Sequence, residues 1–77
     1  MLTNVDTLHN LFIDVFEITD MFIRDKDAVK YRDLYENKLA VLGKEIASIN
    51  VSDNEKVQVM NSVIMERINN KIKKNEK

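Results

Sequence analysis

Apolar residues recur at helical spacing in three successive segments of the chain. In the middle segment, residues 28–49, large side chains return every three or four positions, as on one face of an α-helix. These residues are Tyr31, Tyr35, Leu39, Leu42, Ile46 and Ile49. An adjoining stripe carries Ala40, Gly43 and Ala47, whose small side chains would let a neighbouring helix pack closely. The pattern predicts a central helix with one neighbour on each side.

The first segment predicts a helix of about residues 4–23. Thr3 or Asn4 is a suitable N-cap, and Asp6 lies in the first turn, where negative charge suits the helix dipole. At 100° per residue the apolar face is about 160° wide, whereas a surface helix needs little more than about 100°. We therefore expect this helix to pack against more than one element. Ile13 and Met21 are apolar residues outside its face.

No proline or glycine separates the first segment from the second, but the phase of the pattern predicts a break. If both segments formed one helix, their apolar faces would point about 180° apart. A break near residues 24–27, with Asp25 or Asp27 capping a second helix over residues 27–49, lets the faces meet in an antiparallel hairpin. Leu34 and Val41 lie one heptad apart on this helix, away from both stripes.

Polar residues interrupt the apolar pattern after the middle segment. Asn50 suits the left-handed position that follows a helix, and Ser52 with Glu55 forms the pattern of a capping box. The sequence therefore predicts a third helix over residues 53–73, followed by a frayed tail, 74–77.

The third segment carries its own apolar face, formed by Val57, Met60, Ile64, Met65, Ile68 and Ile72. Val59 and Val63 are expected on the opposite side. Asn61 lies close to the apolar face, where it either fixes the register of a buried contact or stays exposed at the edge.

These segments predict one all-α domain over residues 1–77, a three-helix up-down-up antiparallel bundle. Composition agrees, because the 77 residues include no proline, one glycine and five aromatic residues, which disfavours a β-sheet core. A chain of this length usually builds a core that contributes only about 3–5 kcal/mol. Completion of the core by dimerisation is therefore an open alternative.

Charge and hydropathy exclude several classes of protein. Charged residues make up 32% of the chain and nearly cancel, at a formal net charge of −1, unlike a strongly basic nucleic-acid binder. No apolar run approaches the roughly 18 residues of a membrane span, and the N-terminus lacks the basic region of a signal peptide. We expect a cytoplasmic protein without membrane association. Lys, Asn and Ile make up 26 of the 77 residues, which indicates an AT-rich genome.

The inventory of reactive groups argues against an enzyme. There is no cysteine, and the single histidine, His9, has no evident catalytic partner, so we expect no catalytic, cofactor or metal site. Four carboxylates follow the polar side of the first helix: Asp6, Asp14, Glu17 and Asp20. They form either a solvated ridge or a docking face for a basic partner.

Basic residues gather at the other end of the chain, at Lys71, Lys73, Lys74 and Lys77. This cluster complements a helix C-terminus, and a weak contact with nucleic acid is the functional alternative. The run of residues 46–52 departs twice from the spacing of a helix-turn-helix, because Asn50 comes three residues after Ala47 instead of four and Val57 is one place late for the next apolar position. Asp53 and Glu55 would also face phosphates unfavourably at the start of a recognition helix. Nucleic acid is therefore the less favoured partner.

Apolar residues outside the three faces are the remaining candidates for function, as either an interface or misassigned core. They are Ile13, Met21, Leu34, Val41, Val59 and Val63. The preferred hypothesis is a small interaction protein that binds a partner protein of unknown identity and regulates or inhibits it sterically. It would act as a homo-oligomer, and its size and composition suit a phage or plasmid origin. The alternatives are a small DNA-binding regulator and a structural or assembly subunit.

Overall fold

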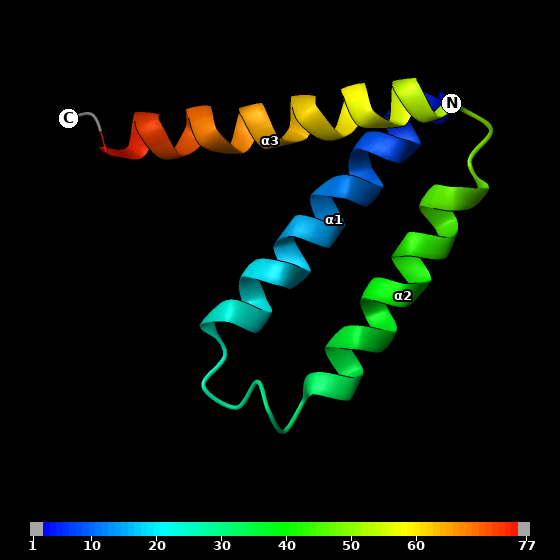
Figure 1. The fold of residues 1–77 in the computed structure, drawn as a ribbon. Helices are drawn as coiled ribbons and strands as arrows, with labels where there is room; N and C mark the ends of the chain where they lie inside the picture. Colours follow the sequence, from blue (N-terminus) through cyan, green and yellow to red (C-terminus); the bar gives the residue numbers. More distant parts are fainter. Residues whose placement is uncertain (1–2, 76–77) are drawn as a thin grey trace.

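The first helix, α1, is where the rest of the chain assembles. The computed structural model describes residues 3–75, and the side-chain exposure of residues 3–73. Helix α1 spans Asn4–Arg24, α2 spans Arg32–Ser48 and α3 spans Asp53–Asn75. Figure 1 shows α1 and α2 as an antiparallel hairpin, with α3 crossing α1 near the N-terminus. The predicted all-α, three-helix bundle is confirmed.

Helix α1 begins as the sequence predicts. The Thr3 hydroxyl accepts from the Asp6 backbone N–H at 3.1 Å, and an Asp6 carboxylate oxygen accepts from the Thr3 N–H at 3.3 Å. These two bonds form a capping box and satisfy N–H groups that the helix leaves without partners. The helix ends at Arg24, so the predicted break near residues 24–27 is also confirmed.

The second helix starts five residues later than predicted, at Arg32, and neither Asp25 nor Asp27 caps it. Asp25 instead closes the preceding turn. Its carboxylate accepts from the Asp27 backbone N–H at 2.8 Å and from the Tyr35 hydroxyl at 2.9 Å. The Tyr35 ring meets the Phe22 ring edge to face at a centroid distance of 5.2 Å. Backbone bonds also hold the turn of residues 25–31, because the Ala28 N–H donates to the Asp25 carbonyl and the Lys30 and Tyr31 N–H groups donate to the Asp27 carbonyl.

The large stripe of α2 is confirmed as the side nearest α1. Five of its six members are partly buried, namely Tyr35, Leu39, Leu42, Ile46 and Ile49, whereas Tyr31, just before the helix begins, is exposed. The adjoining stripe of small residues has no neighbour, because Ala40, Gly43 and Ala47 are exposed. A Cβ added at Gly43 would meet nothing within 4 Å. The prediction that the middle helix has a neighbour on each side is wrong.

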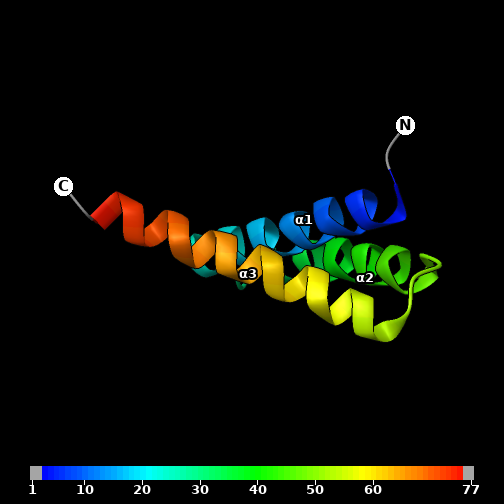
Figure 2. The same ribbon diagram turned by 90° about the horizontal axis from the view of Figure 1, so that it is seen from above.

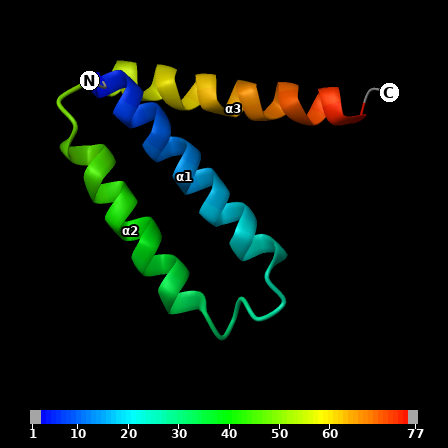
Figure 3. The same cartoon turned by 180° about the vertical axis from the view of Figure 1, so that it is seen from behind.

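The element with two neighbours is α1, as the width of its apolar face predicts. Helix α1 packs against both α2 and α3, whereas α2 and α3 do not pack against each other within the described chain. They share one bond near their connection, from the Lys56 ammonium to the Ala47 carbonyl at 3.2 Å. Figures 2 and 3 show the consequence, a flat molecule in which half of α3 extends beyond the hairpin. Its dimensions are 39 × 37 × 23 Å.

Helix α3 begins where predicted. The Ser52 hydroxyl accepts from the Glu55 N–H at 3.2 Å. Asn50 is not left-handed, because no residue of the described chain has a positive φ. The helix continues through Asn75, two residues beyond its predicted end, so the predicted frayed tail is wrong for Lys74 and Asn75. Residues 76 and 77 of that tail lie outside the described residues.

Three hydrophobic side chains of the described chain are buried: Leu8, Leu11 and Val63. Eleven large hydrophobic side chains are exposed: Val5, Met21, Ile23, Val29, Tyr31, Leu34, Val41, Val57, Met65, Ile68 and Ile72. The core therefore lies where α3 crosses α1, and most of the large apolar surface is left for other contacts.

Candidate interaction surface

An open groove runs between α1 and α2. Its volume is about 430 Å³, and it is lined by Asp14, Glu17, Ile18 and Met21 of α1 and by Asn37, Lys38, Val41 and Leu42 of α2. The volume lies within the range of about 300–1,000 Å³ that is typical of binding pockets. Because the groove follows two antiparallel helices, its long axis suits an elongated apolar segment.

The lining divides into an apolar floor and a charged rim. Met21 and Val41 are 57% and 56% exposed, although both belong to the groove. Two carboxylates, Asp14 and Glu17, form the rim on the α1 side, and Lys38 lies on the α2 side. All three charged residues are exposed. The groove therefore offers apolar contact with negative charge concentrated along one edge.

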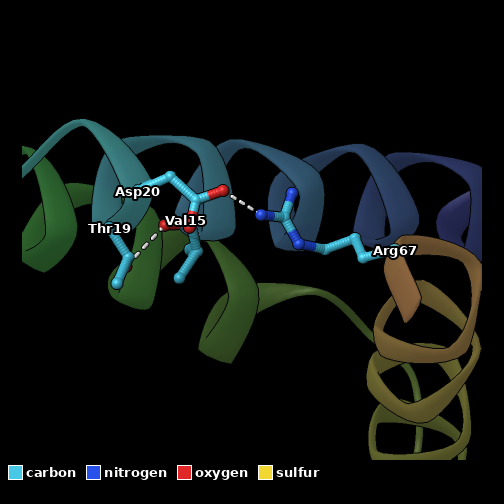
Figure 4. A network of polar contacts seen from close by, with 4 residues as sticks. All are labelled: Val15, Thr19, Asp20 and Arg67. Atoms are coloured by element: carbon cyan, nitrogen blue, oxygen red, sulfur yellow. Dashed lines mark hydrogen bonds and ion pairs between the residues drawn. The ribbon is translucent and has the colours of Figure 1, made fainter. Parts of the chain in front are cut away.

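The four carboxylates on the polar side of α1, called the acidic ridge, differ in their contacts. Asp6 belongs to the N-terminal capping box. Asp20 pairs with Arg67 of α3 (Figure 4). Asp14 and Glu17 remain beside the groove. The part of the ridge that can meet a partner is thus the part next to exposed apolar side chains.

The contacts between α1 and α3 are partly electrostatic. The Arg67 guanidinium pairs with Asp20 and lies 5.4 Å from the centroid of the Phe16 ring. Nearby, the Thr19 hydroxyl donates to the Val15 carbonyl at 2.8 Å, within α1 (Figure 4). Phe16 and Asp20 attach α3 to a side of α1 that differs from the groove side by about 130°, at 100° per residue.

His9 also contributes to the attachment of α3. Its Nε2 lies 3.3 Å from a Glu66 carboxylate oxygen, and its side chain is 32% exposed. The pair links α1 to α3 on the side of α3 that faces α1. His9 therefore has a structural contact across the helix crossing, which the sequence pattern did not predict.

A second hollow of about 510 Å³ lies at the turn end of the hairpin. It is lined by Thr19, Phe22, Ala28, Val29, Arg32, Tyr35, Glu36 and Leu39. Its charged groups already pair with each other, since Arg32 Nε donates to Glu36 at 2.9 Å. The hollow has no charge left to select a partner, so the first groove is the better candidate.

The six predicted partner-binding residues do not form one surface. Met21 and Val41 both line the groove and therefore belong to one surface. Leu34 is exposed but lies outside both hollows. Ile13 and Val59 are partly buried.

Val63 requires a correction. It is 1% exposed and belongs to the core, so its expected place on a solvent-facing side of the third helix is wrong. The reason is the rotation of α3, which turns Val59, Val63 and Arg67 toward α1. Val63 cannot contact a partner while α1 covers it.

The remaining groove residues had a signal in the sequence that was not used. Leu42 belongs to the large stripe of its helix and Ile18 to the wide apolar face of the first helix, and both also line the groove. The i,i+3 and i,i+4 spacing of Asp14, Glu17, Ile18 and Met21 places all four on one side of α1. A search for apolar and acidic residues sharing one side would have found this surface.

Within residues 3–75 no three His, Asp or Glu side chains come together as a metal site would require. No helix in the described part of the chain has the length and hydropathy needed to cross a bilayer. A helix-turn-helix packs its two helices against each other, unlike α2 and α3 here.

Comparisons with family models, with curated proteins and with solved structures found no match for this chain.

Proposed function

We propose that this chain is a helical interaction module that binds a partner protein in the α1–α2 groove. Binding would regulate or inhibit the partner sterically, by covering a functional surface. The observation that supports this proposal is the meeting of Met21 and Val41, both more than half exposed, in one groove beside two carboxylates. Exposed apolar surface next to a polar rim is typical of protein interaction sites.

The chemistry of the groove specifies the kind of partner segment. An amphipathic helix that lies in a groove inserts apolar residues at positions i, i+3, i+4 and i+7. Here its apolar face would contact Ile18, Met21 and Val41, and basic residues at its edge would face Asp14 and Glu17. Charge at the edge contributes mainly to association rate and specificity, while the apolar contact contributes most of the affinity.

Composition and core size support two further parts of the proposal, the origin of the protein and its oligomeric state. The abundance of Lys, Asn and Ile suits a regulator from an AT-rich phage or plasmid that acts in the cytoplasm. The small core favours action as a homo-oligomer. No catalytic step is needed, since a steric regulator requires only binding.

A differential capture experiment tests the proposal. Tagged wild-type protein and a Met21→Lys, Val41→Lys variant are used to capture proteins from cells that express the chain naturally, with quantitative mass spectrometry. We expect a protein retained by the wild type to fall at least about tenfold with the variant. Loss of one buried Val or Met contact costs about 1.5–3 kcal/mol, and about 1.4 kcal/mol is tenfold in affinity.

The matched control is an Ile23→Lys, Val29→Lys variant, which alters two exposed apolar residues that do not line the groove. It should retain the partner, and circular dichroism should show the same helicity for all three proteins. Equal capture by the groove variant and the wild type would contradict the proposal.

A further inference from the structure

Helix α3 carries a continuous apolar stripe that its own chain leaves uncovered. The α3 stripe consists of Val57, Ile64, Met65, Ile68 and Ile72. Ile64 is partly buried, and the other four are 45–54% exposed. The stripe spans about 100° of the helix and about 22 Å of its length. This is the face that the sequence pattern assigned to a buried contact.

The contact with α1 uses a different side of α3. Val59, Val63 and Arg67 point toward α1, at a mean direction about 150° from the centre of the α3 stripe. Figures 1 and 3 both show α3 diverging from the hairpin toward its C-terminus. Glu66 and Arg67 are the last residues of α3 with a polar contact to α1 among those described. Helix α3 would have to rotate about its axis to turn the stripe toward α1. That rotation would expose Val63, so the stripe and Val63 cannot both be covered by α1.

We propose that the α3 stripe is the contact surface between two copies of this chain, which pair their α3 helices in antiparallel orientation. The proposal specifies the oligomer named under the proposed function, and it does not depend on the α1–α2 groove. It assigns to the stripe one occupant, the stripe of the second copy.

The first argument for a second copy is charge complementarity. The first turn of α3 carries Asp53 and Glu55, and Lys71 and Lys73 lie near its other end. All four residues are exposed. Antiparallel pairing about a twofold axis perpendicular to the helices sets the acidic turn of each copy beside the basic end of the other. Parallel pairing would place like charges together.

Three other charged side chains of α3, within the residues whose exposure is described, have contacts elsewhere in the chain. Lys56 donates to the Ala47 carbonyl, Glu66 meets His9, and Arg67 pairs with Asp20. The charges that remain at the edges of the stripe are therefore negative at one end of the helix and positive at the other. A single helix with this distribution is complementary to a reversed copy of itself.

The second argument is the composition of the stripe and of the core. Asn61 lies among the apolar residues of the stripe, where one polar side chain can specify register and oligomeric state in a helix pair. Among residues 3–73, a single copy buries three hydrophobic side chains. Pairing of α3 would add apolar burial where the monomer lacks it, since isolated small cores contribute little stability.

Sedimentation equilibrium of the full chain tests the proposal. The wild type should have about twice the 9.0 kDa mass of one chain. Ile68→Lys should raise the dimer dissociation constant at least about tenfold, because it places a charge in an apolar contact. Ile23→Lys makes the same substitution at an exposed residue of α1 outside the stripe and should leave the mass unchanged. Val41→Lys should also remain dimeric, so the groove and the dimer are tested separately.

Two outcomes would overturn the proposal. One is a wild type that stays monomeric across a wide concentration range, a result that needs no variant. The other is an Ile68→Lys variant as dimeric as the wild type. If Ile68→Lys loses helicity, the wild type supplies the test, because unfolding coupled to dissociation makes the urea midpoint rise with concentration. A midpoint independent of concentration would then reject the dimer.

The orientation is tested with a spin label on Asn54→Cys, which is unique because the chain has no cysteine. Antiparallel pairing centred near Ile64 separates the two labels by about 30 Å along the helix axis, at 1.5 Å per residue. Parallel pairing would hold them near the interaxial distance of about 10 Å. A short distance would reject the antiparallel arrangement.

Discussion

The Tyr35 side chain links the two arms of the hairpin across the turn between them. Its hydroxyl donates to Asp25 at 2.9 Å. The hydrogen bond to Asp25 raises the pKa of Tyr35 above its usual 10.0, with smaller contributions from desolvation and from the negative charge of Asp25. A raised pKa in the folded state means that the contact stabilises the fold at pH values below the unfolded pKa. That contribution is lost as the pH rises through the folded pKa.

Replacement of Tyr35 therefore has a pH-dependent signature. Wild-type protein should lose stability as the pH rises above about 10, the usual tyrosine pKa, and Tyr35→Phe should lose less over the same range because it lacks the titrating hydroxyl. Urea unfolding followed by circular dichroism at several pH values measures the difference. Tyr31→Phe removes a tyrosine hydroxyl outside this contact and should keep the wild-type slope. Parallel pH profiles for wild type and Tyr35→Phe would refute the role of the bond.

Val63 is the residue that fixes α3 onto α1. We expect Val63→Ala to lower the free energy of unfolding by about 2 kcal/mol, from lost burial plus the cavity left behind. Val29→Ala is the matched change at a residue that is 91% exposed, and it should cost less than about 0.5 kcal/mol. Urea denaturation at a fixed protein concentration measures both. An equal effect of the two changes would mean that Val63 does not pack as the structure has it.

At the scale of the element, Gly43 lies in the interior of α2 without a packing reason. A Cβ at this position meets no atom within 4 Å, and its φ is not positive. Gly43→Ala should therefore stabilise the protein by about 1 kcal/mol through helix propensity. Thermal unfolding measures the shift, with Lys44→Ala as a control of nearly neutral effect. A destabilised Gly43→Ala protein would indicate that another molecule approaches the small stripe closely.

Helix boundaries were predictable where a local signal sets them. Thr3 and Ser52 accept hydrogen bonds from N–H groups three residues along the chain, and the sequence pattern predicted both as capping residues. The reciprocal bond to Asp6, which was predicted only to suit the helix dipole, is equally local. The start of α2 was mispredicted because the bond from Tyr35 to Asp25 joins residues that are ten positions apart. Local propensity does not register such a contact.

The rotation of α3 was mispredicted for a related reason. The helix has two apolar sides, a narrow one with Val59 and Val63 and a wide one that forms the α3 stripe. Periodicity shows that both sides exist, but it does not show which of them meets α1. Arg67 contributes to the outcome, because its contacts with Asp20 and Phe16 favour the narrow side.

At the scale of the whole molecule, the all-α fold and the wide contact face of α1 followed from the sequence. The groove followed only in part, since Met21 and Val41 were selected as apolar residues outside the core faces but were assigned to different pairs. Their meeting depends on the hairpin geometry, which sets the relative height of α1 and α2. The periodicity of apolar residues within one helix gives no information on how far that helix is shifted along its neighbour.

The molecule thus presents two separate apolar surfaces, one proposed for a partner and one for a second copy. A dimer formed through the α3 stripe would carry two partner-binding grooves. If the partner is itself oligomeric, the two grooves would raise the effective affinity through multivalency. Titration of wild type and Ile68→Lys against the captured partner should then show weaker apparent binding by the variant, with an unchanged affinity per groove.

Site-specific cross-linking tests most directly whether the groove binds a partner. A photo-reactive group is attached to Lys38→Cys, at the groove rim, or to Lys30→Cys, at an exposed site in the turn outside the groove. The absence of native cysteine makes each attachment unique. After irradiation with the captured partner, we predict a cross-linked product from the Lys38 position and none from the Lys30 position. Equal products from both positions, or none from the Lys38 position, would contradict the groove as the binding site.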